Sequence, residues 1–299
     1  MLEKVASFEP DDQHDEDLFG DDDEPGDDEP GYHEPEDNTW RKPKNKNEQR
    51  IYEHISPHAR IVPFVGIDME GSTVLRYQQN GDLWSFLIPP TGSELPLSTR
   101  ITWAIEIAQG IAHLHAKNVV WADAHFANVL VSDDFHMLLS DFNFSLLNPN
   151  FYHILKTMPP PVFICPIVYR GIQPTHIDIF GFAIMLFALL DYRFPFTEDL
   201  KPRLETQTMI CNKHCDLKFD RLEDSDLDKY FGKLLDDCFN VRIVTGDILV
   251  QALIDARSKW YSETGQRVNP QNTFPQDPEI IPIEPVKLMN PFDSSPYGL

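Results

Sequence analysis

Three polar residues in the middle of the chain are of types that could do phosphoryl chemistry. Asp123 and Asn128 are separated by four residues, and Asp141 follows further along the chain. A carboxylate can accept and orient a hydroxyl group, and carboxylate and amide oxygens suit a hard cation such as magnesium. The spacing Asp-x-x-x-x-Asn alone is common in loops, so its meaning depends on the elements that position it.

The segments around these residues alternate between strand and helix patterns. Residues 129–131 and 137–139 are short apolar strands joined by a predicted hairpin. Residues 179–190 form an apolar run too short to cross a bilayer, which predicts a helix buried on all sides. A capping box from Thr175 to Asp178 is expected to open it. The other predicted elements are strands 61–65 and 72–77 and helices 48–55, 98–117 (N-cap Ser98), 227–239 and 245–261.

In this order, the motifs resemble those of the eukaryotic protein kinases. The segment 123–128 is similar to the kinase catalytic loop, and Asp141-Phe142-Asn143 to the metal-binding Asp-Phe-Gly motif. Segment 48–62 resembles helix C and the strand after it, 74–83 the hinge, and 178–196 the buried helix F. The resemblance implies an α+β, protein-kinase-like bilobal fold with a truncated N-lobe sheet and a helical C-lobe.

The resemblance also implies roles for individual residues. Asp123 would be the catalytic base, while Asn128 and Asp141 would hold the magnesium ion of Mg-ATP. Asp178 would accept hydrogen bonds from the catalytic-loop backbone, or would only cap its own helix. The expected nucleotide contacts are Leu75 as gatekeeper, backbone groups of Arg76 and Gln78 at the adenine, Asp82 at the ribose, Leu130 below the adenine, and Glu48 as the glutamate of helix C.

The sequence departs from the family pattern before Glu48. No segment there has the glycine-rich phosphate loop or the Val-Ala-x-Lys strand. Lys42, Lys44 and Lys46 lie closer to Glu48 than the usual strand-then-helix placement allows. We therefore expect that no lysine pairs with Glu48 and that the first strands of the N-lobe have no counterpart.

Further departures lie in the catalytic and activation segments. Trp121-Ala122 replaces the usual His-Arg, His125 replaces a phosphate-touching lysine, and Asn143 replaces a glycine. Cys165-Pro166-Ile167 stands where Ala-Pro-Glu is expected. Without the arginine, control by a phosphate on the activation loop is not expected.

Three functions fit these motifs. The first is a pseudokinase that recruits protein partners, and the second is a weakly active, ATP-dependent Ser/Thr-type protein kinase. The third is a small-molecule phosphotransferase, because Asp123-Ala-His125-Phe-Ala-Asn128 also resembles the Asp-x-His-x-x-Asn loop of aminoglycoside and choline kinases. The order of the segments after 178 argues against the third.

Composition divides the chain into a domain and two tails. Residues 1–38 form an acidic segment expected to be disordered and able to dock a basic partner, since Lys4 is its only lysine or arginine. Residues 39–262 form the kinase-like domain, with a partial N-lobe to about residue 78 and the C-lobe over 79–262. Residues 263–299 form a proline-rich tail.

Charge and cysteine content exclude some classes of protein. The net charge of -23 comes mainly from the acidic tail, and no basic stripe suited to nucleic acid is present. The four cysteines lie in a chain whose N-terminus has no apolar signal region, so they are expected to be reduced thiols. These features favour a cytoplasmic or nuclear protein without a membrane span.

Overall fold

The computed structural model describes residues 38–55, 57–87, 95–149, 161–163, 173–265 and 281. The predicted acidic tail, apart from Asn38, lies outside these residues. So do most of the proline-rich tail and the segment Cys165-Pro166-Ile167. Small sheets and packed helices together make up the described part, which confirms the predicted α+β class.

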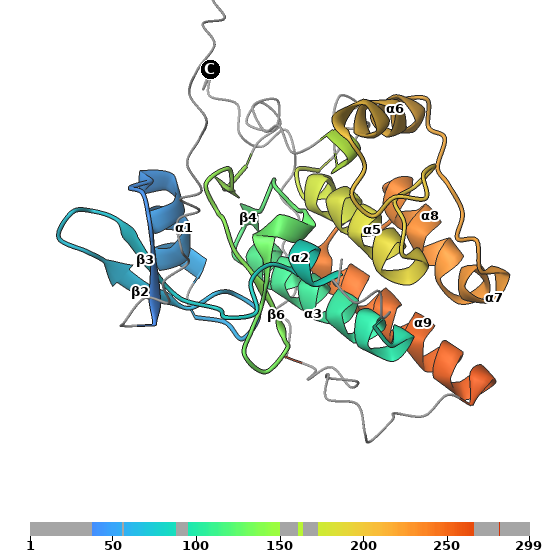
Figure 1. Cartoon of the computed structure of the whole chain (residues 1–299), viewed down its shortest axis with the longest axis horizontal. Helices are drawn as coiled ribbons and strands as arrows, with labels where there is room; N and C mark the ends of the chain where they lie inside the picture. Colours follow the sequence, from blue (N-terminus) through green and yellow to red (C-terminus); the bar gives the residue numbers. More distant parts are fainter. Residues whose placement is uncertain are drawn as a thin grey trace, which may run out of the picture. The chain divides into compact units, whose positions relative to one another are not determined.

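A three-stranded antiparallel sheet and one helix form the first part of the fold (Figure 1). The strand order is β1 (Thr39–Lys42), β3 (Thr73–Arg76) and β2 (Phe64–Ile67). Only residues 43–45 separate β1 from helix α1 (Lys46–Ile55). Asn45 sets the start of this helix, because its Oδ1 accepts hydrogen bonds from the backbone N–H groups of Asn47 (2.9 Å) and Glu48 (3.1 Å).

The rest of the described chain is mainly helical. Its helices are α2 (Leu83–Leu87), α3 (Leu97–Ala116), α5 (His176–Asp191), α6 (Leu204–Cys215), α7 (Ser225–Leu227), α8 (Lys233–Phe239) and α9 (Gly246–Thr264). One π-helical turn, Asp228–Gly232, joins α7 to α8. Two short strand pairs lie among the helices: β4 (Val119–Val120) with β7 (Leu146–Leu147), and β5 (Val129–Val131) with β6 (Met137–Leu139).

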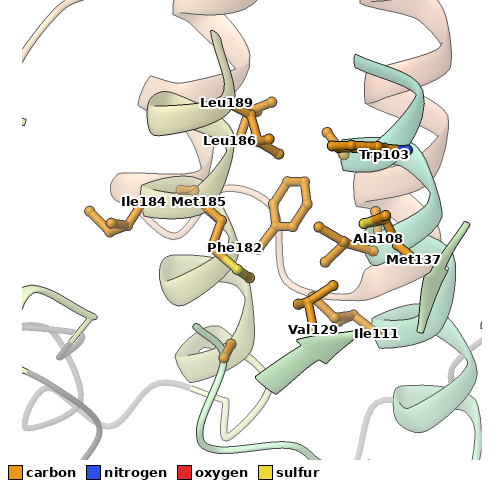
Figure 2. Close-up of a cluster of buried hydrophobic side chains, with 14 of the residues drawn as sticks. Trp103, Ala108, Ile111, Val129, Met137, Phe182, Ile184, Met185, Leu186 and Leu189 are labelled. Atoms are coloured by element: carbon orange, nitrogen blue, oxygen red, sulfur yellow. The ribbon is translucent and has the colours of Figure 1, made fainter. Parts of the chain in front are cut away.

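Helices α3 and α5 enclose the core (Figure 2). Every residue of α5 from His176 to Leu190 is buried, as predicted from its apolar run. Phe182 of α5 projects between the two helices toward Ala108 and Ile111 of α3, and Val129 joins the same cluster from the β5–β6 hairpin. Burial of each large apolar side chain contributes about 1.5–3 kcal/mol. The cluster therefore holds α3 and α5 together and supports the loops that follow α3.

The segment before β2 is attached to the helical part by backbone and charged groups. The Leu139 N–H donates to the Arg60 carbonyl (2.9 Å), and the Val62 N–H donates to the Leu139 carbonyl (3.0 Å). Arg60 forms a buried ion pair with Glu106 of α3 (3.1 Å). A hydrogen bond to Glu106 raises the pKa of His136 above its ordinary value. These contacts hold the sheet part against the β5–β6 hairpin.

Two predicted helix caps are wrong. Helix α3 begins at Leu97 with Pro96 in the N-cap position, and no side chain caps it, so Ser98 lies inside the helix. Thr175 makes no capping hydrogen bond either; its hydroxyl donates to the Val244 carbonyl (2.6 Å). Asp178 likewise turns to a distant segment, described below. Both side chains of the expected capping box therefore make long-range contacts.

The crossing of α3 and α9 depends on Gly246. A Cβ atom added there would lie 2.4 Å from Cα and 2.5 Å from N of Ala112, and backbone atoms cannot move aside as a side chain can. We expect Gly246→Ala to lower the free energy of unfolding by about 3 kcal/mol, as overpacking does. Denaturant unfolding checks this. Asp255→Ala, on the exposed face of α9, is the control and should change stability by less than about 0.5 kcal/mol. Equal effects of the two substitutions would contradict the close crossing.

Candidate active site

Asp178 holds the backbone that precedes Asp123. It is fully buried, and its carboxylate accepts hydrogen bonds from the N–H groups of Trp121 (2.8 Å) and Ala122 (2.7 Å). Ala122 has a φ of 67°, in the left-handed region that costs energy for a residue with a side chain. The paired N–H groups stabilise this bend, so Asp178 of α5 positions Asp123.

His115 of α3 supports the same carboxylate. Its Nε2 lies 3.0 Å from Oδ2 of Asp178, and its Nδ1 accepts the N–H of Gly246 (3.0 Å). Because Nδ1 accepts, Nε2 carries the proton that is donated to Asp178. Helices α3, α5 and α9 thus meet at one chain of hydrogen bonds behind the loop 121–128.

The structure brings Asp123 and Asn128 into direct contact. Asn128 Nδ2 donates to Oδ2 (2.9 Å) and to the carbonyl oxygen (3.1 Å) of Asp123. His125 Nε2 lies 3.3 Å from Oδ1 of Asp123. The exposed fraction is 9% for Asp123 and 7% for Asn128, so both residues are buried. The amide orientation leaves Oδ1 of Asn128 as the atom that suits a cation.

Ser140 connects Asp141 to the loop 121–128. Its N–H and hydroxyl both donate to the Asn128 carbonyl (2.9 Å each), and its own carbonyl accepts the indole N–H of Trp121 (2.9 Å). Trp121, which stands where the resemblance predicts a histidine, therefore supplies a ring N–H donor to the residue just before Asp141. Asp141 itself has a φ of 53° and a side chain that is 32% exposed.

A lysine does pair with Glu48, so the expectation that none would is wrong. Lys42 Nζ lies 2.6 Å from Oε1 of Glu48 and 3.2 Å from Oδ1 of Asp141. Glu48 is fully buried. Burial raises its pKa above the ordinary value, although the hydrogen bond and charge of Lys42 act in the opposite direction. One strand residue, one helix residue and one loop residue thus form a charged cluster.

The short connection between β1 and α1 explains why sequence reasoning missed Lys42. The family pattern has a longer segment between the lysine strand and the helix. Asn45, three residues before Glu48, was a signal for the helix start. It places Glu48 in the first turn, and Lys42 at the end of β1 then reaches it across a turn of three residues.

Asn47 is a second residue that the sequence did not reveal. Its Nδ2 donates to the carbonyl oxygens of Asn143 (3.1 Å) and Ser145 (2.9 Å). These bonds join the first turn of α1 to the loop that follows Asp141. Helix α1 is therefore linked to the segment around Asp141 twice, by the Asn47 hydrogen bonds and by the ion pair of Lys42.

Aromatic packing reinforces this arrangement. Tyr52 of α1 stacks on Phe64 of β2, with ring centroids 5.2 Å apart, and meets Phe142 edge-on at 4.9 Å. Phe142, next to Asp141, is fully buried. This packing holds the backbone at Phe142, which follows Asp141, while Ser140 holds the backbone that precedes it.

Leu75, Arg76 and Gln78 lie on or just after β3. Leu75 is fully buried, and the Arg76 N–H donates to the Pro63 carbonyl (2.9 Å). The Gln78 side chain donates to the Arg76 carbonyl (3.2 Å), which is one of the backbone groups expected to meet adenine. A carbonyl has two lone pairs, so this bond reduces its acceptor capacity without removing it. Their contacts with a nucleotide stay predictions.

Asp82 and Leu130 lie side by side through a β-bridge. Leu130 is half-buried. The carboxylate of Asp82 caps α2, because it accepts hydrogen bonds from both the N–H and the hydroxyl of Ser85 (2.9 Å each). The structure thus gives Asp82 a capping role, and its predicted contact with a ribose stays untested.

The oxygen donors present fit magnesium. Asp141 offers a partly exposed carboxylate and Asn128 an amide oxygen, both of the hard type that magnesium prefers. Within the described ranges, no cluster of three or more His, Cys, Asp or Glu side chains could hold a metal by itself. Magnesium in proteins usually takes one or two side-chain oxygens and fills its other positions with water or phosphate oxygens, which is compatible with this pair.

Comparison with known proteins agrees with this geometry. Residues 33–244 match the family model described as the protein kinase domain. Within the described part of the chain, none of the helices combines the length and apolar character needed to cross a membrane.

Individual relatives are similar at a lower level. The Arabidopsis thaliana LEAF RUST 10 disease-resistance locus receptor-like protein kinase-like 1.2 is 28% identical over 179 residues, 56% of this chain and 27% of that protein. Human receptor-interacting serine/threonine-protein kinase 1 is 26% identical over 52% of this chain and 26% of its own length. The probable serine/threonine-protein kinase PBL20 of Arabidopsis thaliana is 27% identical over 60% of this chain and 50% of its own length. The chain thus spans between about a quarter and a half of these relatives.

Proposed function

Because this chain belongs to the protein kinase domain family, we propose that it binds Mg-ATP and transfers the terminal phosphoryl group to a hydroxyl group of a protein. The observation that carries the proposal is the buried pair of Lys42 and Glu48, with Lys42 Nζ also 3.2 Å from Asp141. The positive charge for the phosphates and the carboxylate for the metal lie in one site.

Each residue has a role in the proposed transfer. Lys42 would bind phosphate oxygens, and Glu48 orients its ammonium group. Asn128 and Asp141 would hold magnesium, which neutralises charge on the phosphates when bound. Asp123, held by Asn128, would orient the substrate hydroxyl and accept its proton.

A binding module without catalysis is the second candidate. The Gln78 side chain occupies the Arg76 carbonyl, and both oxygens of Asp82 are engaged in capping α2. These bonds reduce the number of free hydrogen-bond acceptors that could bind the base and the ribose. The match to the protein kinase domain extends to residue 244 and covers α5 to α8, which favours a protein over a small molecule as the phosphate acceptor.

Thermal unfolding with ATP, in the presence and absence of magnesium, tests nucleotide binding. We expect the unfolding temperature of the wild type to rise only when both are present, because ligands stabilise the state they bind. Asp141→Asn should remove the rise, since its amide lacks the anionic metal ligand. Asp123→Asn should keep the rise and lower phosphoryl transfer to a protein substrate at least about 100-fold. Asp133→Asn, an exposed carboxylate in the hairpin turn, is the control for both measurements.

Two results would contradict parts of this proposal. No rise at millimolar nucleotide would favour the binding module. A rise that is independent of magnesium and unaffected by Asp141→Asn would show that the metal site is wrongly assigned.

A further inference from the structure

Trp40 differs from the other tryptophans in its exposure. All five tryptophans lie in the described residues, and Trp40 keeps 43% of its surface exposed. Trp103, Trp121 and Trp260 are buried, and Trp84 is half-buried. Single exposed apolar side chains are common on protein surfaces, so the interest of Trp40 lies in its position in the fold.

Trp40 lies on the face of the sheet that carries Lys42. Residues two apart on a strand point to the same side, and Lys42 Nζ lies over the Trp40 ring, 5.7 Å from its centroid. Arg41, between them, reaches Asp68 instead (4.0 Å).

The pairing of the strands shows which face this is. Trp40 is paired with Leu75 of β3, and Leu75 is paired with Phe64 of β2, so the three side chains share one face. Phe64 stacks on Tyr52 of α1, which identifies it as the face toward the candidate site. At the β1 end of this face, Trp40 keeps 43% of its surface exposed, and the cation that would bind phosphates lies over its ring.

We propose that Trp40 is the stacking platform for the base of the nucleotide. The inference deepens the proposed function and rests on it. A nucleotide whose phosphates reach Lys42 and Asp141 has its base one ribose away, within reach of a ring 5.7 Å from the ammonium group. Stacking on an aromatic side chain is worth about 5- to 150-fold in affinity. It also needs no base-edge hydrogen bonds, which the Gln78–Arg76 contact reduces here.

Two ligands separate stacking from phosphate binding. Mg-ATP carries a base, and magnesium tripolyphosphate carries the same charged chain without one. Affinities for both would be measured by calorimetry on the wild type, Trp40→Ala, Trp40→Phe and Val65→Ala. Val65 is an exposed apolar residue on β2 of the same sheet and serves as the matched control.

We expect Trp40→Ala to weaken Mg-ATP at least about fivefold and to leave tripolyphosphate unchanged. Trp40→Phe, which keeps an aromatic face, should stay within about threefold of the wild type for both ligands. Val65→Ala should change neither affinity. In the wild type, Mg-ATP should quench the emission of the exposed tryptophan more than tripolyphosphate does.

The contrary results are distinct. Unchanged or tighter ATP binding by Trp40→Ala, with tripolyphosphate still bound, would overturn the stacking role and leave the proposed function standing. Equal loss of both ligands would show that Trp40 acts through Lys42, which also overturns it. Failure of the wild type to bind either ligand would refute the proposed function and this inference together.

Discussion

Lys42→Met is expected to lower the free energy of unfolding by about 3–5 kcal/mol at neutral pH, as removal of one partner of a buried ion pair does. Glu48 is fully buried, and among the described residues Lys42 is the only positively charged side chain paired with it within 4 Å. The substitution should also abolish Mg-ATP binding, because the cation for the phosphates is gone. Denaturant unfolding and the thermal titration measure the two effects.

The loss of stability should depend on pH. The pKa of Glu48 is raised in the folded wild type, and without Lys42 it should rise further. A carboxyl group whose folded pKa is raised adds stability below its unfolded pKa and loses that contribution as the pH rises through the folded pKa. The cost of Lys42→Met should therefore be largest above the folded pKa of Glu48 and shrink toward acidic pH, where Glu48 is neutral.

Glu48→Gln provides the matched control. In that background Lys42→Met leaves no buried anion, so its cost should be clearly smaller than in the wild type. A cost that is the same in both backgrounds and at every pH would contradict the assignment of the ion pair.

Asp178→Ala should lower the free energy of unfolding by more than about 4 kcal/mol. It leaves the N–H groups of Trp121 and Ala122 and the ring N–H of His115 buried without their acceptor, and each such group costs about 1–3 kcal/mol. Denaturant unfolding measures the loss.

Asp178→Asn keeps the protein testable if the alanine variant does not fold. The amide keeps one acceptor oxygen for the three N–H donors that share two oxygens in the wild type. We therefore expect a smaller loss of stability than in Asp178→Ala. Phosphoryl transfer should fall while Mg-ATP binding persists, because the backbone before Asp123 is disturbed and Lys42 is not. A change below about 1 kcal/mol in Asp178→Ala would show that these bonds do not hold the loop.

Local patterns predicted the helical part of the fold well. Strands β5 and β6 have the predicted bounds, because a tight hairpin brings 129–131 and 137–139 together within one short segment. The apolar run 179–190 predicted the burial of α5, and the family match confirms the protein-kinase-like fold.

Contacts between distant segments could not be predicted in the same way. The capping box at Thr175 is a local pattern, but Thr175 and Asp178 bond to residues more than fifty positions away. Trp121 stands where the family has a histidine, and only the folded structure shows that its indole N–H donates to the Ser140 carbonyl. Lys42 could not be identified from the family pattern, because the connection between its strand and the helix that carries Glu48 is shorter here than in that pattern.

The three-residue connection between β1 and α1 has a mechanical consequence. Glu48 lies about 4.5 Å along the helix axis from the capping residue Asn45, whereas Ile55 lies about 15 Å from it. If α1 tilts about Asn45, its far end moves about three times as far as Glu48 does. The ion pair with Lys42 therefore lies close to the pivot of the helix, where a tilt displaces the side chains least. A tilt of α1 would change the Lys42–Glu48 distance little and would be an inefficient way to inactivate this site.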